Sequence, residues 1–391
     1  MKKSLLLLLL QCALVLCGRE IPFLATAPVI DGSPGDAVWK KAAYIPRFNS
    51  YGEEKSPCQA KVWYGYDRNF FYVLFLCEHG DVKNIAASYT EHDDKVYFDD
   101  EVEVFIDSSG RRQDYHQILV NAKGVVFDQY VDKNGRTQID WNSDVKAVGK
   151  ILKDSYCVEM AIPLASLNFA ENTSGQMGLA FSRVLNYCKD QKFVLGEFHR
   201  IGTWTRFNFP VRHGVRLEKF TMPTYAGKHK VEFFIQNLTS KARKLEGFFD
   251  KEKVTCLLPP KQTKRLVFNV HHKVGEKTSH RLSLKEGEQE LIRFYRLFKA
   301  ADLLTAFPVS SVIYKGEKLQ LKVRIGEKPE SALQVEYLSL EGKTLWQKKF
   351  KIKGRTATLS LPFDHPEAKV VLSYKGVSSS MTIRSVKGPW Q

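Results

Sequence analysis

The sequence predicts an all-β protein: an N-terminal antiparallel β-sandwich followed by two smaller immunoglobulin-like β modules. Two observations support this prediction. Apolar and polar residues alternate with period two in many short runs, and no long stretch has the 3.6-residue pattern of an amphipathic helix. Turn-forming residues separate the runs, as at Asp67-Arg68-Asn69.

The predicted strands of the first module lie within residues 28–218. The clear alternating runs are Val62–Tyr66, Phe70–Cys77, Glu101–Ile106, Tyr115–Val120, Val125–Val131 and Tyr156–Ile162. Short strands joined by tight turns favour two antiparallel sheets packed face to face, with one side chain in two directed to the core.

Two further strand series follow, and we assign them to modules at residues 221–303 and 304–391. The first contains Val231–Gln236, Val254–Leu258, Lys264–Val270, Arg281–Leu284 and Leu291–Phe298. The second contains Leu319–Ile325, Leu333–Leu340, Ala357–Leu361 and Val370–Tyr374. Each series is long enough for one small sandwich.

Residues 1–18 have the pattern of a secretory signal peptide. A charged start precedes the apolar run Leu5–Leu10, and this run is too short and too early for an ordinary membrane span. We expect cleavage near Cys17 or Gly18, and a lipid anchor on Cys17 is the alternative. The mature chain is therefore expected to be secreted, periplasmic or attached to the cell surface.

Export makes disulfides permissible, but only five cysteines follow residue 18, so at least one must remain unpaired. Cys77 and Cys157 lie inside apolar runs, and we interpret both as small buried hydrophobes. Trp39, in "DAVWKKA", is interpreted as an anchor of the core.

The net charge of +16 belongs to the C-terminal part of the chain. Residues 1–220 hold 27 basic and 27 acidic residues, whereas residues 221–391 hold 32 and 16. A basic half favours anionic surfaces or polymers. Its lysines are spread through strand patterns, as at Lys349, Lys351 and Lys353, so a solvated strand face explains them and we expect no nucleic-acid partner.

The stretch "DDEVEVFID" (residues 99–107) combines a strand pattern with five carboxylates. Val102, Val104 and Ile106 form its inward set, which leaves Glu101 and Glu103 on the opposite face. Carboxylates two residues apart on a strand are separated by about 7 Å, within the range of an inverting glycosidase pair. The same carboxylates would also serve as acceptors for the hydroxyl groups of a bound sugar.

An ordered series of motifs runs through residues 28–218. It contains "VIDGSPGDAVWKKA", "VWYGYDRNFFYVLFLCE", "YFDDEVEVFIDSSGRRQDYHQILVNAKGVVFD", "VEMAIPLASL", "GLAFSRV" and "TWTRF". In this order the motifs resemble the family 9 carbohydrate-binding modules, first known as appendages of xylanases, and their relatives in bacterial exported proteins. The resemblance does not extend over residues 221–391. It implies a β-sandwich that binds sugar between two aromatic side chains and often holds structural calcium.

The resemblance also implies a set of site residues. Tyr97 stands six residues before the glutamate of the "DD-VE" strand, where the family commonly has tryptophan, and Glu103 is that glutamate. Arg183 matches the arginine of the "F-R" strand, and Trp204 matches the second stacking aromatic that follows it. Gln117 lies on the neighbouring "Y-Q" strand.

These residue types suit a sugar. A pyranose has apolar C–H faces that stack on aromatic rings, while its hydroxyl groups need acceptors such as Glu103 and donors such as Arg183. We expect Tyr97, Arg183 and Trp204 to converge on one exposed concavity with Glu103 at its floor. The alternatives are a half-buried Tyr97, a core Trp204 and an internal ion pair for Arg183.

The sequence is compatible with three functions. The first is an exported, non-catalytic protein that binds an oligosaccharide or polysaccharide and supports polysaccharide catabolism together with a partner glycoside hydrolase. The second is a glycoside hydrolase that uses carboxylates of residues 99–107. The third is an interaction protein whose sandwich has lost its ligand.

Overall fold

The computed structural model describes residues 19–52, 56–167, 169, 172, 174–210, 214–310 and 313–387. Within these ranges the regular structure is β-strand with a few short 3₁₀ turns and no α-helix, so the predicted all-β class is confirmed. The proposed signal peptide and Cys17 lie outside the described residues. No helix in the described part of the chain is long and apolar enough to cross a membrane.

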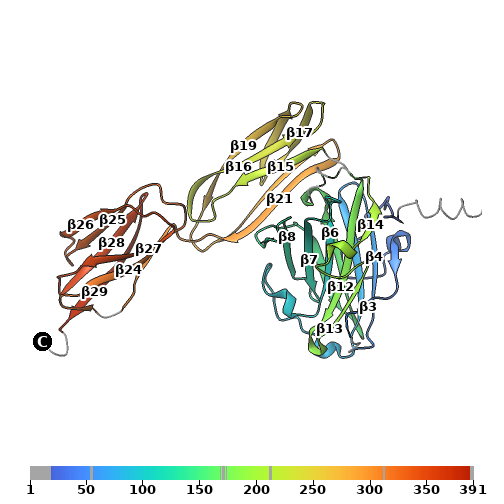
Figure 1. Ribbon diagram of the computed structural model, residues 1–391, viewed down its shortest axis with the longest axis horizontal. Helices are drawn as coiled ribbons and strands as arrows, with labels where there is room; N and C mark the ends of the chain where they lie inside the picture. Colours follow the sequence, from blue (N-terminus) through green and yellow to red (C-terminus); the bar gives the residue numbers. More distant parts are fainter. Residues whose placement is uncertain are drawn as a thin grey trace, which may run out of the picture. The chain divides into compact units, whose positions relative to one another are not determined.

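The N-terminal sandwich is built from two sheets (Figure 1). The larger runs β1-β14-β12-β6-β7-β8-β9, with β13 beside β12 and β3 beside β13. Its strands are β1 (Arg19–Glu20), β3 (Asn49–Ser50), β6 (Glu101–Asp107), β7 (Tyr115–Asn121), β8 (Val126–Val131), β9 (Thr137–Gln138), β12 (Gln176–Leu185), β13 (Asp190–Val194) and β14 (Thr205–Asn208). The smaller sheet contains β10 (Lys146–Ile151), β11 (Ser155–Pro163), β5 (Phe70–Glu78), β4 (Ala60–Tyr66) and β2 (Ala43–Ile45), in this order.

The main core lies between these two sheets. Val102, Val104 and Ile106 of β6 are fully buried in it together with Phe75 of β5 and Met160 of β11. The inward set predicted for residues 99–107 is therefore confirmed. Because successive side chains of a strand point to opposite faces, Glu101, Glu103 and Phe105 must lie on the opposite face of the larger sheet.

A second, smaller cluster covers the outer face of the five-stranded sheet. Trp39, on the 3₁₀ turn η1 (Ala37–Lys41), is buried there and donates its indole N–H to Oε1 of Glu159 at 2.9 Å. Oε2 of Glu159 accepts from the backbone N–H groups of Asp31 and Gly32. Trp39 is thus a core anchor, as predicted. Cys77 and Cys157 are also buried and unpaired, which confirms their interpretation as hydrophobes.

The remaining strands lie after residue 214. They are β15 (Val215–Thr221), β16 (Gly227–Asn237), β17 (Arg243–Phe249), β18 (Glu252–Leu258), β19 (Thr263–His272), β20 (Lys277–Glu286), β21 (Gln289–Lys299), β22 (Leu304–Pro308), β23 (Ile313–Tyr314), β24 (Lys318–Ile325), β25 (Leu333–Leu338), β26 (Thr344–Phe350), β27 (Thr356–Pro362), β28 (Glu367–Tyr374) and β29 (Val377–Val386). They form the sheets β15-β16-β19, β18-β17-β20-β21, β22-β24-β27 and β23-β29-β28-β25-β26.

The contacts divide the chain into two compact units, and strands of the middle region contribute to both. The predicted division into modules at 221–303 and 304–391, and their immunoglobulin-like type, stay predictions. The C-terminal strands enclose a core of their own, in which Leu319, Leu321, Val335, Val370 and Leu372 are fully buried.

Candidate functional site

The outer face of the nine-stranded sheet brings four polar side chains together. Across this sheet, Glu103 of β6 is paired with Ser182 of β12, and Gln117 of β7 is paired with Gln129 of β8. Phe105 of β6, two residues from Glu103, is paired with Gln117. Because side chains at paired positions share a face, all of these side chains point away from the sandwich core.

Hydrogen bonds join the polar side chains into one network. The Gln129 amide donates to Oε1 of Gln117, and the Gln117 amide donates to Oε2 of Glu103, each at 2.5 Å. The hydroxyl of Ser182 donates to the other oxygen of Glu103 at 3.0 Å. Glu103 is only 4% exposed, whereas Gln129 is half-buried. The network therefore connects a buried carboxylate to the surface, and the expectation that Glu103 forms an exposed floor is wrong.

Glu101 lies beside this network and is buried with it. Its Oε2 has no hydrogen-bond partner in the described part of the chain. Burial, followed by the charge of neighbouring Glu103, raises the pKa of Glu101 well above its ordinary value. Burial also raises the pKa of Glu103, although the hydrogen bonds from Gln117 and Ser182 oppose that shift. The geometry favours a protonated Glu101 next to an ionised Glu103.

This arrangement predicts a specific pH dependence of stability. A carboxyl group whose pKa is raised in the folded state contributes stability below its unfolded pKa and loses it as the pH rises through the folded value. Glu101→Gln keeps the shape without the charge, so we expect it to stabilise the sandwich by about 1–3 kcal/mol at alkaline pH and to flatten the profile.

Chemical denaturation between about pH 4 and pH 9 checks this expectation. Glu78→Gln is the matched control, because that side chain is half-exposed on the other sheet. If the free energy of unfolding of Glu101→Gln changed with pH as it does in the parent and in Glu78→Gln, the proposed protonation of Glu101 would be contradicted.

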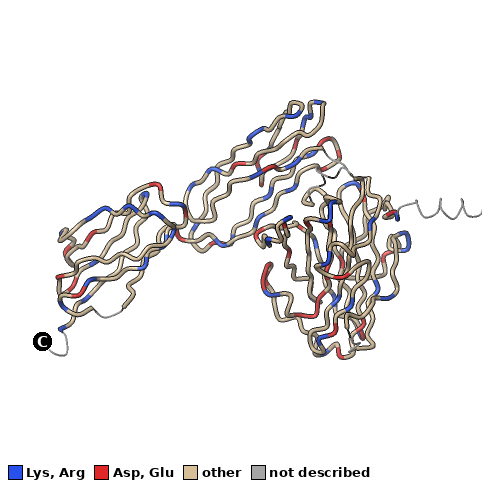
Figure 2. Tube along the Cα trace, viewed as in Figure 1, with Lys and Arg blue, Asp and Glu red and all other residues tan. Residues whose placement is uncertain are grey.

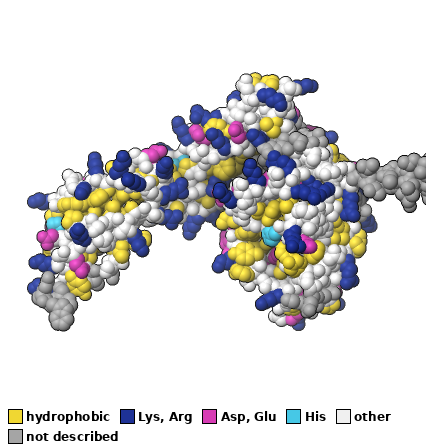
Figure 3. Space-filling view, in the orientation of Figure 1, with side chains coloured by type: hydrophobic (Ala, Val, Ile, Leu, Met, Phe, Trp, Pro, Cys, Tyr) yellow, Lys and Arg dark blue, Asp and Glu magenta, His cyan; other side chains and the backbone are white. Residues whose placement is uncertain are grey.

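Aromatic side chains flank the network on the side of β8. Tyr97, on the 3₁₀ turn η3 (Val96–Phe98), is 46% exposed, and its ring meets that of Phe127 edge-on at 5.7 Å. Phe127 shares a face of β8 with Gln129, two residues along the strand. Phe98 is also exposed. Figure 3 shows hydrophobic side chains gathered on the surface of this sandwich.

Trp204, which directly precedes β14, packs on the same face of this sheet but is not open to solvent. It is 2% exposed, and its ring packs against Phe105 at 5.5 Å and Tyr115 at 5.1 Å. Its indole N–H donates to the carbonyl of Glu197 at 2.8 Å. The loop between β13 and β14 supplies this acceptor together with packing partners such as Phe198. The expectation that Trp204 lines an exposed concavity together with Tyr97 is therefore wrong, and Trp204 is a core residue of this face.

Arg183 does not join the site at all. It stands next to Ser182 on β12 and is paired with Val102, so its side chain points into the sandwich. It is fully buried, where its guanidinium donates to the Asp190 carboxylate at 3.1 Å and to the Cys58 carbonyl at 2.8 Å. The expected convergence of Arg183 with Glu103 is wrong because one position along a strand reverses the face.

The structure adds residues that the sequence motifs do not indicate. Gln129, Phe127 and Tyr115 border the network, and the Tyr115 hydroxyl lies 2.9 Å from Nδ1 of His199. The hairpin turn between β7 and β8 is the sequence feature from which the position of Gln129 could have been predicted. Once Gln117 is placed on the outer face, pairing across this turn puts Gln129 beside it.

One cluster in the described ranges has donor atoms that could hold a metal: His92, Asp93 and Asp128, whose donor atoms lie within 4.8 Å of one another. Nδ1 of His92 is 3.0 Å from Oδ2 of Asp93, and burial raises the pKa of Asp128 to about 6. Calcium takes six to eight oxygen ligands, so an imidazole beside two carboxylates does not fit the calcium that the family resemblance implies.

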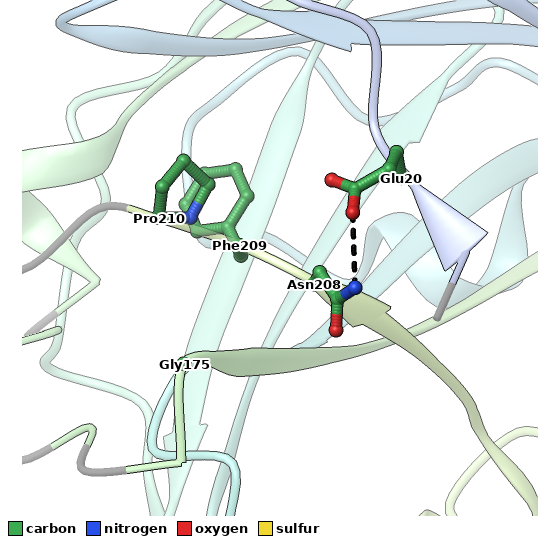
Figure 4. A pocket seen from close by; sticks show the side chains of 5 residues that line it. All are labelled: Glu20, Gly175, Asn208, Phe209 and Pro210. Atoms are coloured by element: carbon green, nitrogen blue, oxygen red, sulfur yellow. Dashed lines mark hydrogen bonds between the residues drawn. The ribbon is translucent and has the colours of Figure 1, made fainter. Parts of the chain in front are cut away.

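Two surface pockets lie away from the polar network. One is lined by Glu20, Gly175, Asn208, Phe209 and Pro210, and the Asn208 amide donates to Glu20 across it (Figure 4). The other is lined by polar side chains at the β8–β9 hairpin, including Asp114, Tyr130 and Gln138. None of the predicted site residues lines either pocket.

The N-terminal sandwich is similar to known proteins. Residues 30–195 match the family model described as "Carbohydrate family 9 binding domain-like". Among solved structures, the chain is similar to a family 9 carbohydrate-binding module from Caldicellulosiruptor kristjanssonii in complex with cellotriose, with 20% identity and a TM-score of 0.35 over 49% of this chain and 94% of that one. The same module in complex with glucose matches with 20% identity and a TM-score of 0.33, over 49% of this chain and 95% of that one. No curated protein matches the sequence.

Proposed function

We propose that this chain is an exported, non-catalytic carbohydrate-binding protein, because residues 30–195 match the family model described as "Carbohydrate family 9 binding domain-like". The sugar occupies the outer face of the nine-stranded sheet, at the surface end of the Glu103–Gln117–Gln129 network. The observation that carries the proposal is this network in a family 9 domain, with exposed Tyr97 and half-buried Phe127 beside it.

The chemistry of this surface suits a neutral sugar. The half-buried Gln129 offers amide groups for hydroxyl groups of the ligand, and its orientation is fixed through Gln117 by the buried carboxylate. The exposed ring of Tyr97 provides a face for the C–H groups of a pyranose. Glu103 then acts as a positioning residue behind the surface, since both of its oxygens accept hydrogen bonds from the protein.

Replacement of the exposed aromatic tests the proposal. We expect Tyr97→Ala to weaken binding of cellotriose by at least about tenfold, because about 1.4 kcal/mol of stacking and burial is lost. Isothermal titration calorimetry measures the affinity. Tyr44→Ala is the matched control, since Tyr44 is similarly exposed but stacks on Trp63 of the opposite sheet.

Gln129→Ala should also weaken binding, and thermal melts should show all three variants folded. A Tyr97→Ala protein that binds a broad set of oligosaccharides as the parent does would overturn the proposed site. A folded parent chain that binds none of them would favour an interaction module without a sugar ligand.

The wider role is proposed from the sequence. The signal-like residues 1–18 support export, with Cys17 as the alternative lipid-anchor site. Carbohydrate binding outside the cell would support polysaccharide catabolism through a partner glycoside hydrolase. N-terminal sequencing of the mature protein from its native host distinguishes a cleaved from a lipidated start, and a retained leader would contradict export by this route.

The geometry favours binding over hydrolysis by this chain. An inverting pair of carboxyl groups needs space between them for a water and the scissile bond. Glu101 and Glu103 are both buried, and Glu103 is held by Gln117 and Ser182. Turnover of a chromogenic glycoside that disappears in Glu103→Gln would restore the hydrolase alternative.

A further inference from the structure

The outer face of the sheet β22-β24-β27 is cationic, and none of the described residues of these three strands is acidic. On the central strand β24, Lys318, Lys322 and Arg324 alternate with buried leucine and valine, so all three point outward. Gln320 shares this face and donates to the Ser360 hydroxyl of β27 at 2.7 Å. Figure 2 shows basic residues along the strands of this region.

The flanking strands surround these cations with hydroxyl groups. Thr356 and Thr358 of β27 are paired with Arg324 and Lys322. On the other side, β22 places Thr305 beside Arg324 and the exposed ring of Phe307 beside Lys322. The pairing therefore defines a flat surface of ammonium, guanidinium, amide and hydroxyl groups with one aromatic ring.

The cations on this surface are not neutralised by the protein. No ion pair within the described ranges involves Lys318, Lys322 or Arg324, although acidic side chains elsewhere in this region, such as Glu327 and Glu367, do pair with cations. The charge of +16 resides in residues 221–391 as a whole, so the surrounding field also attracts anions. An uncompensated row of cations is complementary to a polymer that presents negative charges along its length.

We propose that this face, which we call the β24 face, binds a linear acidic polysaccharide carrying carboxylate or sulfate groups. Lys322 and Arg324 are about 7 Å apart and Lys318 is about 14 Å from Lys322, as strand geometry requires, so the cations meet successive charged groups of an extended chain. The hydroxyl groups of β27 bind the sugar hydroxyls between those charges. A lipid surface would need more apolar side chains to insert than Phe307 and its exposed neighbour Val309.

Binding of the full mature chain to polygalacturonate and chondroitin sulfate tests the proposal. Dextran serves as the neutral polymer, and phosphatidylglycerol vesicles and single-stranded DNA serve as other polyanions. We expect tight binding to at least one of the two acidic polysaccharides at low salt, none to dextran, and weaker binding to the vesicles and DNA. Affinity should fall steeply with salt concentration, because counterions are released.

Removal of the three cations gives the decisive comparison. We expect the variant Lys318→Gln/Lys322→Gln/Arg324→Gln to lose at least about tenfold in affinity at low salt and to show a smaller salt slope. The control Lys343→Gln/Lys349→Gln/Lys351→Gln removes the same charge from exposed positions of this region outside the β24 face, so it should lose no more than about twofold. Circular dichroism and thermal melts check that both variants fold.

Equal losses in the two variants would overturn the proposal, since net charge alone would then explain binding. Tighter binding to vesicles or DNA than to either polysaccharide would also overturn it. The outcome is independent of the sandwich site, because Tyr97→Ala leaves the β24 face unchanged and the triple variant leaves cellotriose binding unchanged.

Discussion

Trp204→Ala should destabilise the N-terminal sandwich by about 3–5 kcal/mol, the cost of removing a buried tryptophan from a packed site. The ring is buried against Phe105 and Tyr115, and its N–H is bonded to Glu197, so the substitution opens a cavity and leaves that carbonyl without its donor. Thermal melts and chemical denaturation of the full chain measure the loss.

Trp204→Phe is the matched variant. It keeps most of the apolar volume and loses only the hydrogen bond, so we expect a cost of about 1–2 kcal/mol. If Trp204→Ala melted as the parent does and lost only sugar affinity, Trp204 would be a surface stacking residue and its burial in the structure would be contradicted.

Asp190→Ala should cost about 3–5 kcal/mol as well, because it leaves buried cations without their counter-charge. The Asp190 carboxylate lies 3.1 Å from the guanidinium of Arg183 and 3.6 Å from Nζ of Lys192, and all three side chains are almost completely buried. Lys192 retains Ser50 and the carbonyl of Ser56 as partners. Arg183 retains the carbonyl of Cys58 but no carboxylate.

A double variant tests whether the unpaired guanidinium of Arg183 causes the loss of stability in Asp190→Ala. Arg183→Met combined with Asp190→Asn removes the buried guanidinium together with the carboxylate, so we expect it to recover part of the stability lost in Asp190→Ala. Equilibrium denaturation of the parent, Arg183→Met, Asp190→Asn and the double variant measures the coupling. Strictly additive losses would show that the ion pair contributes nothing beyond the packing of each side chain.

Local sequence patterns were sufficient to predict the all-β class and the side chains of residues 101–106 that face the core. Alternation alone placed Val102 and Val104 in the core and Glu103 on the opposite face, because successive side chains of a strand point to opposite sides. The apolar runs around Cys77 and Cys157, and the sequence "DAVWKKA" around Trp39, also predicted correctly that these three side chains are buried. The ordered motifs predicted the resemblance to family 9 carbohydrate-binding modules, and the match of residues 30–195 to that family model confirms it.

Which outward-facing residues remain exposed could not be predicted from the sequence, because it depends on the packing of distant segments. The outer face of β6 is covered by other parts of the chain, among them Trp204, so Glu103 and Phe105 are buried although strand alternation directs them away from the sandwich core. The partners of Arg183 depend on β13, which brings Asp190 beside it from outside the motif. Period-two patterns report the face of a sheet on which a side chain lies. Whether a loop packs over that face depends on contacts between residues far apart in the sequence, and these do not appear in the local pattern.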